Sequence, residues 1–148
     1  MVDRKARLSY YLSRAFYMET TRRHKHYLEV AKRMALQSNY GKLKHGAVLV
    51  KGNKIVNASC NKGGFCSFGQ RFRERTMGTP TLHAELGCIL NLDRSVTQGA
   101  FIFVVRVGHK GNFMISKPCS MCHAALEHVG VKRVYHTSEN GKLEMYKI

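Results

Sequence analysis

Apolar positions near the start of the chain recur at helical spacing in two places. The first stretch contains Leu8, Tyr11, Leu12, Ala15 and Phe16, and the second contains Tyr27, Val30, Ala31, Met34 and Ala35. Residues spaced by three, four and seven positions share one face of a helix, so each stretch predicts an amphipathic helix. The run Arg22–His26 then reads as a cationic joint, and we expect residues 1–26 to form a basic helical N-terminal segment.

Further along, short apolar runs predict strands that alternate with helices. Gly46–Lys51 and Lys54–Ser59 flank Gly52-Asn53, a pair that suits a two-residue hairpin turn. Helices are expected from near His83 and from near Cys119, the latter ending at Gly130. Strands are expected at Ala100–Val107, Val131–His136 and Leu143–Ile148, with a turn at Glu139-Asn140-Gly141 between the last two.

This order of elements predicts the fold class α/β. Residues 1–148 are expected to form a single domain, a three-layer α/β/α sandwich around a five-stranded mixed sheet. The strand after Gly130 should lie parallel to the one before the helix, through a right-handed crossover. The last two strands are joined by too few residues for a helix, so they should form an antiparallel pair. Residues 61–80 are expected to form a long loop.

The net charge of the chain narrows the class of molecule that it is expected to bind. The chain contains 25 Lys and Arg against 9 Asp and Glu, which gives a formal net charge of +16. Residues 1–44 alone carry 11 basic against 3 acidic residues. Such an excess favours attraction to polyanions, with single-stranded nucleic acid as the leading candidate partner. The alternative is that the charge serves only solubility.

Cysteine usage and hydropathy suggest an intracellular protein, cytoplasmic or nuclear. The five cysteines are an odd number and no secretory signal precedes them, so a disulfide framework is not expected. No apolar run approaches the roughly 20 residues that span a bilayer, so no membrane partner is expected. The Arg-rich start faintly resembles a mitochondrial transit peptide, although Asp3 and Glu19 interrupt it.

Two short clusters contain the candidate chemistry: His83-Ala84-Glu85 and Pro118-Cys119-Ser120-Met121-Cys122. Cysteines three apart in the first turn of a helix can face one point, and His83 can supply a third donor from the other helix. Zinc prefers nitrogen and sulfur donors, and a catalytic zinc keeps one position open. We therefore predict one Zn²⁺ per chain on His83, Cys119 and Cys122.

Glu85 is the candidate catalytic residue. Zinc lowers the pKa of a bound water towards about 7, and a nearby carboxylate can move that water's proton to a ring nitrogen and then to a departing amine. This sequence of steps is hydrolytic deamination. Two alternatives remain open, a redox C-x-x-C pair and a structural zinc site. The structural site would need a fourth ligand such as His123, His128, Cys88 or Cys60.

The spacing H-x-E followed by P-C-x-x-C is a signature of zinc nucleobase deaminases. From about Leu28 onward the chain resembles the cytidine deaminase superfamily. The resemblance includes His45–Val50, Asn61 and the two clusters His83–Glu85 and Pro118–Cys122, which we call the first and second zinc boxes. The resemblance implies that Asn61 contacts the sugar or base, and that backbone groups at Ala84 and Cys119 touch the base. We add His45, which precedes a strand, as a candidate pocket residue. For Asn61 a turn role is an equal alternative.

The substrate depends on weaker features. Met121 resembles the tRNA adenosine deaminases, whereas an antiparallel C-terminal pair resembles free cytidine deaminases and bacterial toxin deaminases. We favour cytosine. Arg71, Arg73, Arg75 and Phe72 in the 61–80 loop are candidate contacts to nucleic acid, because arginines pair with phosphates and aromatic rings stack on unpaired bases. The alternative is an apolar loop anchor beside solvated arginines.

Three hypotheses follow. The first is a zinc-dependent deaminase that converts cytosine to uracil in single-stranded DNA or RNA. The second is a deaminase of free cytidine, deoxycytidine or deoxycytidylate, which would be expected to form a homo-oligomer. The third is a non-enzymatic nucleic-acid-binding protein with a structural zinc, which the presence of Glu85 argues against.

Overall fold

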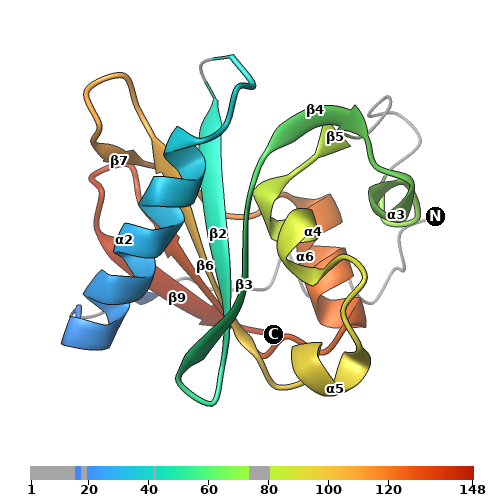
Figure 1. Cartoon of the computed structure of the whole chain (residues 1–148). Coiled ribbons are helices and arrows are strands. Elements are labelled where there is room, and N and C mark those ends of the chain that lie inside the picture. The colour runs from blue at the N-terminus through green and yellow to red at the C-terminus, as the bar shows by residue number, and fades with distance from the viewer. Residues whose placement is uncertain (1–15, 18–19, 42, 74–80) are drawn as a thin grey trace.

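A mixed β-sheet forms the middle of the molecule (Figure 1). The computed structural model describes residues 16–17, 20–41, 43–73 and 81–148. Seven strands form this sheet in the order β1-β9-β8-β6-β2-β3, and β7 pairs with β6. Their bounds are β1 Phe16–Tyr17, β2 Lys44–Lys51, β3 Lys54–Cys60, β6 Phe101–Val107, β7 Phe113–Met114, β8 Arg133–Thr137 and β9 Leu143–Lys147. The five predicted strands are present, and the two-residue strands β1 and β7 add to them.

Helices cover both faces of this sheet, which confirms the three-layer α/β/α prediction. Helix α2 (Arg22–Leu36) packs on one face, and α4 (Ala84–Ile89) and α6 (Ser120–His128) pack on the other (Figure 1). The shorter helices are α3 (Ser67–Gln70) and α5 (Arg94–Thr97). Strand β2 is buried on both faces: Leu49 points to the α4 and α6 side and Val48 to the α2 side. Burial on both faces explains its continuous apolar run.

The predicted strand directions are also confirmed. Strand β8 runs parallel to β6 and antiparallel to β9, so a helical crossover through α6 joins β6 to β8 and a short turn joins β8 to β9. The β2–β3 turn has positive φ at both Gly52 and Asn53, 58° and 62°, as a type I′ hairpin requires. This topology brings the two zinc boxes, at the starts of α4 and α6, to the same end of the sheet.

The predicted N-terminal organisation needs correction. Arg22–His26 is not a joint but the start of α2, because Thr21 forms the N-cap: its Oγ1 accepts from the His24 N–H at 3.2 Å. His24 Nδ1 accepts in return from the Thr21 N–H. Charge alone does not interrupt a helix, since Arg and Lys are good helix formers. Phe16, predicted to be helical, lies instead in β1, and the rest of the predicted first helix lies outside the described residues.

The predicted loop at 61–80 contains regular structure. Strands β4 (Lys62–Phe65) and β5 (Thr81–Leu82) form a separate two-stranded sheet, and α3 follows β4. Residues 74–80 lie outside the described part of the chain, Arg75 among them. Within the described part, no helix has both the length and the apolar character that a membrane span requires.

Candidate metal centre and its pocket

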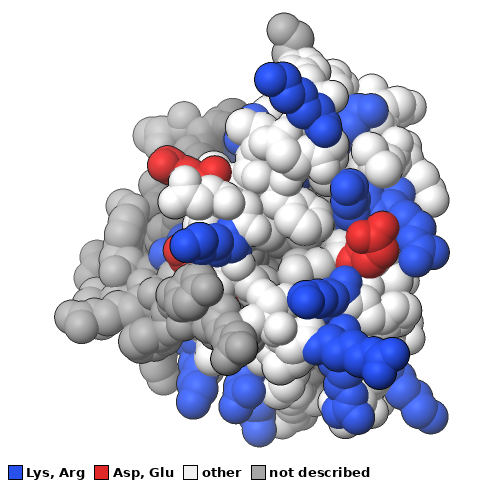
Figure 2. All heavy atoms as spheres, turned by 90° about the vertical axis from the view of Figure 1, so that its left-hand side faces the viewer, with Lys and Arg blue, Asp and Glu red and all other residues white. Residues whose placement is uncertain are grey.

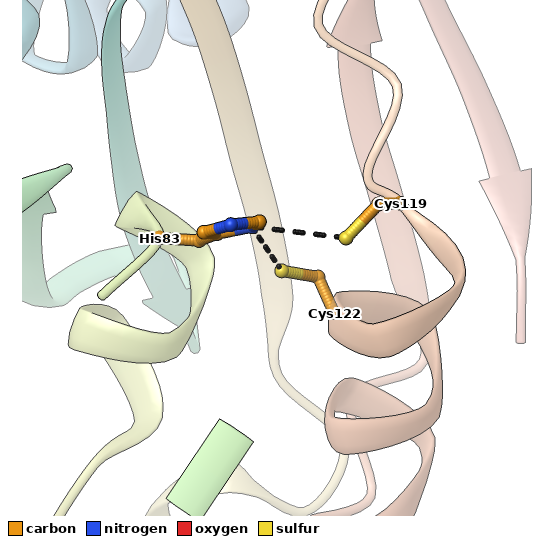
Figure 3. Close-up of side chains that lie close together, drawn as sticks. All are labelled: His83, Cys119 and Cys122. Carbon is orange, nitrogen blue, oxygen red and sulfur yellow. Dashed lines mark hydrogen bonds between the residues drawn. The ribbon is translucent and has the colours of Figure 1, made fainter. Parts of the chain in front are cut away.

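Two helix N-termini bring three metal-binding side chains together. His83 is the N-cap residue of α4, Cys119 is the N-cap residue of α6, and Cys122 lies in the first turn of α6. His83 Nδ1 lies 3.2 Å from Cys122 Sγ and 3.7 Å from Cys119 Sγ (Figure 3). All three donor atoms lie within 4.8 Å of one another. The N-cap positions leave the side chains of His83 and Cys119 free to point off the helix ends.

This donor set fits a zinc ion. Tetrahedral zinc with bonds of about 2.0 Å to nitrogen and about 2.3 Å to sulfur places neighbouring donors roughly 3.6 Å apart, close to the separations found here. Cys60, Cys88, His123 and His128, the candidate fourth ligands, lie outside the group, which is the one such group among the described residues. Three protein donors leave a fourth position for another molecule, as in catalytic zinc sites.

The local electrostatics also suit a metal. A hydrogen bond from the Cys122 thiol, together with one from His83, lowers the pKa of Cys119 to about 4. The hydrogen bond to Cys119 raises the pKa of His83, whereas burial holds the pKa of Cys122 well above its usual value. The lowered pKa favours the thiolate form of Cys119, which is the form that binds zinc.

Glu85 lies in the first turn of α4 and borders the same pocket as His83. Its side chain is buried, with 5% of the residue exposed, and burial raises the pKa of its carboxyl. A carboxyl with a raised pKa holds a proton more readily at neutral pH, which suits a group that receives and returns one. The structure therefore places a buried carboxyl with a raised pKa next to the candidate metal position.

A cavity of about 210 Å³ opens onto these side chains. Its lining includes His83, Glu85 and Cys119, together with three residues that sequence reasoning identified from the resemblance or position, His45, Asn61 and Ala84. Apart from Cys122, which is buried in the metal-binding group, the predicted metal, catalytic and substrate residues thus meet at one pocket, although they come from β2, the β3–β4 connection and the starts of two helices.

Asn61 has a structural task as well as a place in the pocket. Its side-chain Oδ1 accepts from the His45 N–H at 3.0 Å, and its Nδ2 donates to the Leu43 carbonyl at 2.6 Å. One amide hydrogen and one lone pair remain for a substrate. Burial, followed by the nearby Arg106, lowers the pKa of His45 to about 4, so its ring is neutral at neutral pH and can both donate and accept.

Five further residues line the cavity: Tyr40, Leu43, Thr81, Ser116 and Lys117. Tyr40, Leu43 and Thr81 carried no signal in the sequence, whereas Ser116 and Lys117 belong to the stretch before Cys119 that carries the family resemblance. Tyr40 and Leu43 follow α2 and come near the zinc boxes only through the tertiary fold.

The structure places the four predicted nucleic-acid contacts of the 61–80 loop in different surroundings. Phe72 is 8% exposed and packs in the core on the α6 side, with its ring 5.3 Å from Phe68, so it serves as the apolar anchor and offers no face to a base. The Arg71 guanidinium lies 5.6 Å from the centre of the Phe72 ring. Arg73 reaches Met121 in the second zinc box, with Nη1 3.9 Å from Sδ. Arg75 lies outside the described residues.

Comparison with known proteins agrees with this geometry. The family model described as the cytidine and deoxycytidylate deaminase zinc-binding region matches residues 21–138. A deoxycytidylate deaminase of Schizosaccharomyces pombe is 29% identical, over 78% of this chain and 37% of the relative. The chain thus spans about a third of that relative's length.

Two solved structures of Acinetobacter baumannii RibD, forms 1 and 2, also resemble it. Their TM-scores are 0.42 and 0.44 at 20% and 19% identity, over 77% of this chain and 26% of each RibD chain. The decisive match is the family model, which covers both zinc boxes and most of the fold. The chain belongs to the zinc-dependent cytidine and deoxycytidylate deaminase family, with zinc as its cofactor.

Proposed function

We propose that this protein is a hydrolytic deaminase that converts cytosine to uracil. The observation that supports this proposal most strongly is the convergence of His83, Cys119 and Cys122 on one point, beside a pocket lined by His83, Cys119 and the buried Glu85. Three donors with an adjacent proton carrier suit hydrolysis, whereas a structural site would need a fourth donor and no acid.

In this proposal His83, Cys119 and Cys122 hold the zinc ion. When bound, the ion supplies a nucleophile from water at neutral pH. Glu85 accepts the proton of that water and delivers it to the ring nitrogen N3 of cytosine, which makes C4 more open to attack. The oxygen of the water bonds to C4, and Glu85 takes the second proton from this new hydroxyl and passes it to the exocyclic amine, so that the C4–N bond breaks and ammonia leaves. Its burial favours this role, because the raised pKa lets the carboxyl hold each proton between accepting and delivering it.

The other pocket residues position the base. Ala84 and Cys119 present backbone groups at the start of α4 and α6, where they can contact the edge of a base. The remaining hydrogen and lone pair of Asn61 and the neutral ring of His45 are available to the sugar or base. Because Asn61 also fixes the backbone at Leu43 and His45, its loss would disturb that wall of the pocket as well.

For the substrate we propose cytosine in single-stranded nucleic acid. The net charge of +16 supports a polyanionic substrate, and Arg73 stands beside the second zinc box. A deaminase that acts on nucleic acid needs a base that is already unstacked, which single strands provide. Free deoxycytidylate is the second candidate. The Schizosaccharomyces pombe relative is named a deoxycytidylate deaminase, and Lys117 at the pocket could pair with a single phosphate.

A substrate competition separates these two. The zinc-loaded protein is incubated with single-stranded DNA, single-stranded RNA, deoxycytidylate and cytidine, and uracil formation is followed for each. We expect the largest kcat/KM for one of the two polynucleotides. Turnover of the monomers alone would replace the first candidate by the second.

A further inference from the structure

A larger hollow lies away from the zinc pocket, beside the first turn of α2. Its volume is about 650 Å³, and it is bordered by α2, the β2–β3 turn and the starts of β6 and β8. His45 at the zinc pocket and Val50 at this hollow lie on the same strand, five residues apart. At about 3.3 Å per residue the two sites are separated by roughly 17 Å along β2.

The floor of this hollow is aromatic. Phe103 and Tyr135, which are 1% and 3% exposed, stack beneath it with ring centres 4.2 Å apart, and the partly exposed His24 ring lies 5.2 Å from that of Tyr135. The guanidinium of Arg133 lies 4.9 Å from the centre of the Phe101 ring. His24 and Phe101 are the partly exposed rings of this floor, and aromatic surfaces beside an arginine plane are the surfaces on which unpaired bases stack.

The rim is cationic. Arg22, Arg23, Lys51 and Arg133 border the hollow, and none of its described lining residues is Asp or Glu. Arg22 and Arg23 are exposed, and neither forms an ion pair with another residue of the described ranges. The Thr21 and His24 side chains already occupy backbone groups at the α2 N-terminus, so the arginine side chains are the groups available to phosphates.

A second hollow continues the first around the tip of α2. It has a volume of about 450 Å³, shares Arg22, Arg23 and Asn53 with the first, and adds Lys54. We call the two together the α2-tip groove. Lys and Arg side chains gather on the side of the molecule that carries α2, with few acidic side chains between them (Figure 2). Two adjoining hollows with cationic side chains in both suit a chain of phosphates better than one nucleotide.

We propose that the α2-tip groove binds single-stranded nucleic acid, with phosphates on Arg22 and Arg23 and bases against the partly exposed rings of His24 and Phe101. The groove then holds a strand at a distance from the zinc pocket. Its link to catalysis rests on the proposed function, whereas its binding of a strand does not.

The test measures binding of a labelled oligothymidylate of about twelve nucleotides, within the range that single-strand sites cover, by fluorescence anisotropy at several salt concentrations. Because the probe contains no cytosine, the result is independent of deamination. The test variant is Arg22→Ala/Arg23→Ala. The matched control is Lys25→Ala/Arg33→Ala, which removes two exposed cations from the same helix but outside the groove. Zinc content and thermal midpoint report the fold of each variant.

We expect the test variant to lose about tenfold or more in affinity, and its slope of log K against log salt to fall by about 1.4, since each phosphate contact on a single strand accounts for about 0.7. The control should change both much less. Equal losses of affinity in the two variants would overturn the proposal, because binding would then depend on the total charge of the helix and not on the groove. So would equal competition by thymidine monophosphate, because the groove would then be a mononucleotide site. Oligouridylate in place of oligothymidylate shows whether the strand is RNA or DNA.

Discussion

His83 and Cys119 occupy equivalent places, each at the residue that precedes the first turn of its helix. An N-cap residue has extended backbone, so its side chain is directed past the helix end while the next residues begin the turn. Cys122 and Glu85 then follow within that first turn. Local geometry of this kind is encoded within a few residues, which is why the metal donors and Glu85 could be predicted from spacing alone.

Replacing one donor tests the metal assignment. Cys119→Ser should weaken zinc binding by more than about 100-fold, because the thiolate donor itself is removed. Loss of a residue that only supports a metal ligand costs up to about 100-fold. Competition with a chromophoric chelator measures this affinity. Cys60→Ser, at a buried cysteine outside the donor group, is the matched control and should keep wild-type affinity. Equal affinity in the two variants would contradict the assignment.

His136 contributes a pH dependence of stability. Burial lowers its pKa to about 4 from 6.5, while Glu144 lies 3.9 Å away and Lys117 opposes the ring's charge. The folded state therefore binds fewer protons than the unfolded state, and stability falls as pH drops from about 6.5 towards 4. By linkage, this one ring should cost about 2 kcal/mol at pH 5 relative to pH 7.

Urea unfolding at both pH values checks this effect. The pH-dependent loss should be about 2 kcal/mol smaller in His136→Gln than in the wild type, because the remaining histidines are common to both proteins. An identical loss in the two proteins would show that the ring titrates normally.

At the scale of elements, prediction succeeded where a pattern was local and failed where tertiary contacts decide. The apolar spacing of Tyr27–Ala35 located the core of α2, and Gly52-Asn53 gave the hairpin turn. The start of α2 was missed because a capping interaction, not hydrophobicity, sets it. Strand β1 was missed because its two residues are ordered by pairing with β9, which the sequence near Phe16 does not reveal. Phe72 was predicted as a contact to nucleic acid, with an apolar anchor as the alternative, because its burial depends on α6, which is distant in sequence.

The contact between α2 and β2 depends on Gly46. A Cβ there would meet the Ala31 carbonyl oxygen and would lie 2.6 Å from the Ala35 nitrogen, both of them backbone atoms of α2 that cannot rotate away. Gly46→Ala should therefore destabilise the fold by about 3 kcal/mol, as overpacked cores do. At Gly64 a Cβ meets nothing within 4 Å, so Gly64→Ala should change stability by less than about 0.5 kcal/mol. Thermal or urea unfolding of both variants decides; similar stabilities would contradict the close packing.

At the scale of the whole molecule, the sheet brings together residues that the sequence keeps apart. The zinc pocket unites side chains from residue 40 to residue 119, and only the order of strands explains why Tyr40 and Lys117 share it. The α2-tip groove likewise joins Arg22 to Arg133. The charge total indicated a polyanion but carried no geometry, so neither the groove nor the pocket wall could be predicted from composition.

Zinc should also stabilise the whole fold, because it joins the N-termini of α4 and α6. Binding to the folded state alone adds about 2.7 kcal/mol when free zinc is 100 times its dissociation constant. Chelation should therefore lower the thermal midpoint of the wild type and leave that of Cys119→Ser nearly unchanged. A wild-type midpoint that ignores the chelator would mean that the donors hold no metal.

The most direct test of the account compares wild type with Glu85→Gln, both loaded with zinc, on cytosine-containing single strands and on deoxycytidylate. Mass spectrometry follows the conversion of cytosine to uracil. The account predicts uracil with the wild type, at least about 1,000-fold slower turnover with Glu85→Gln, and equal zinc content in both proteins. Comparable rates in the two proteins, or no deamination of any cytosine compound by the zinc-loaded wild type, would contradict it.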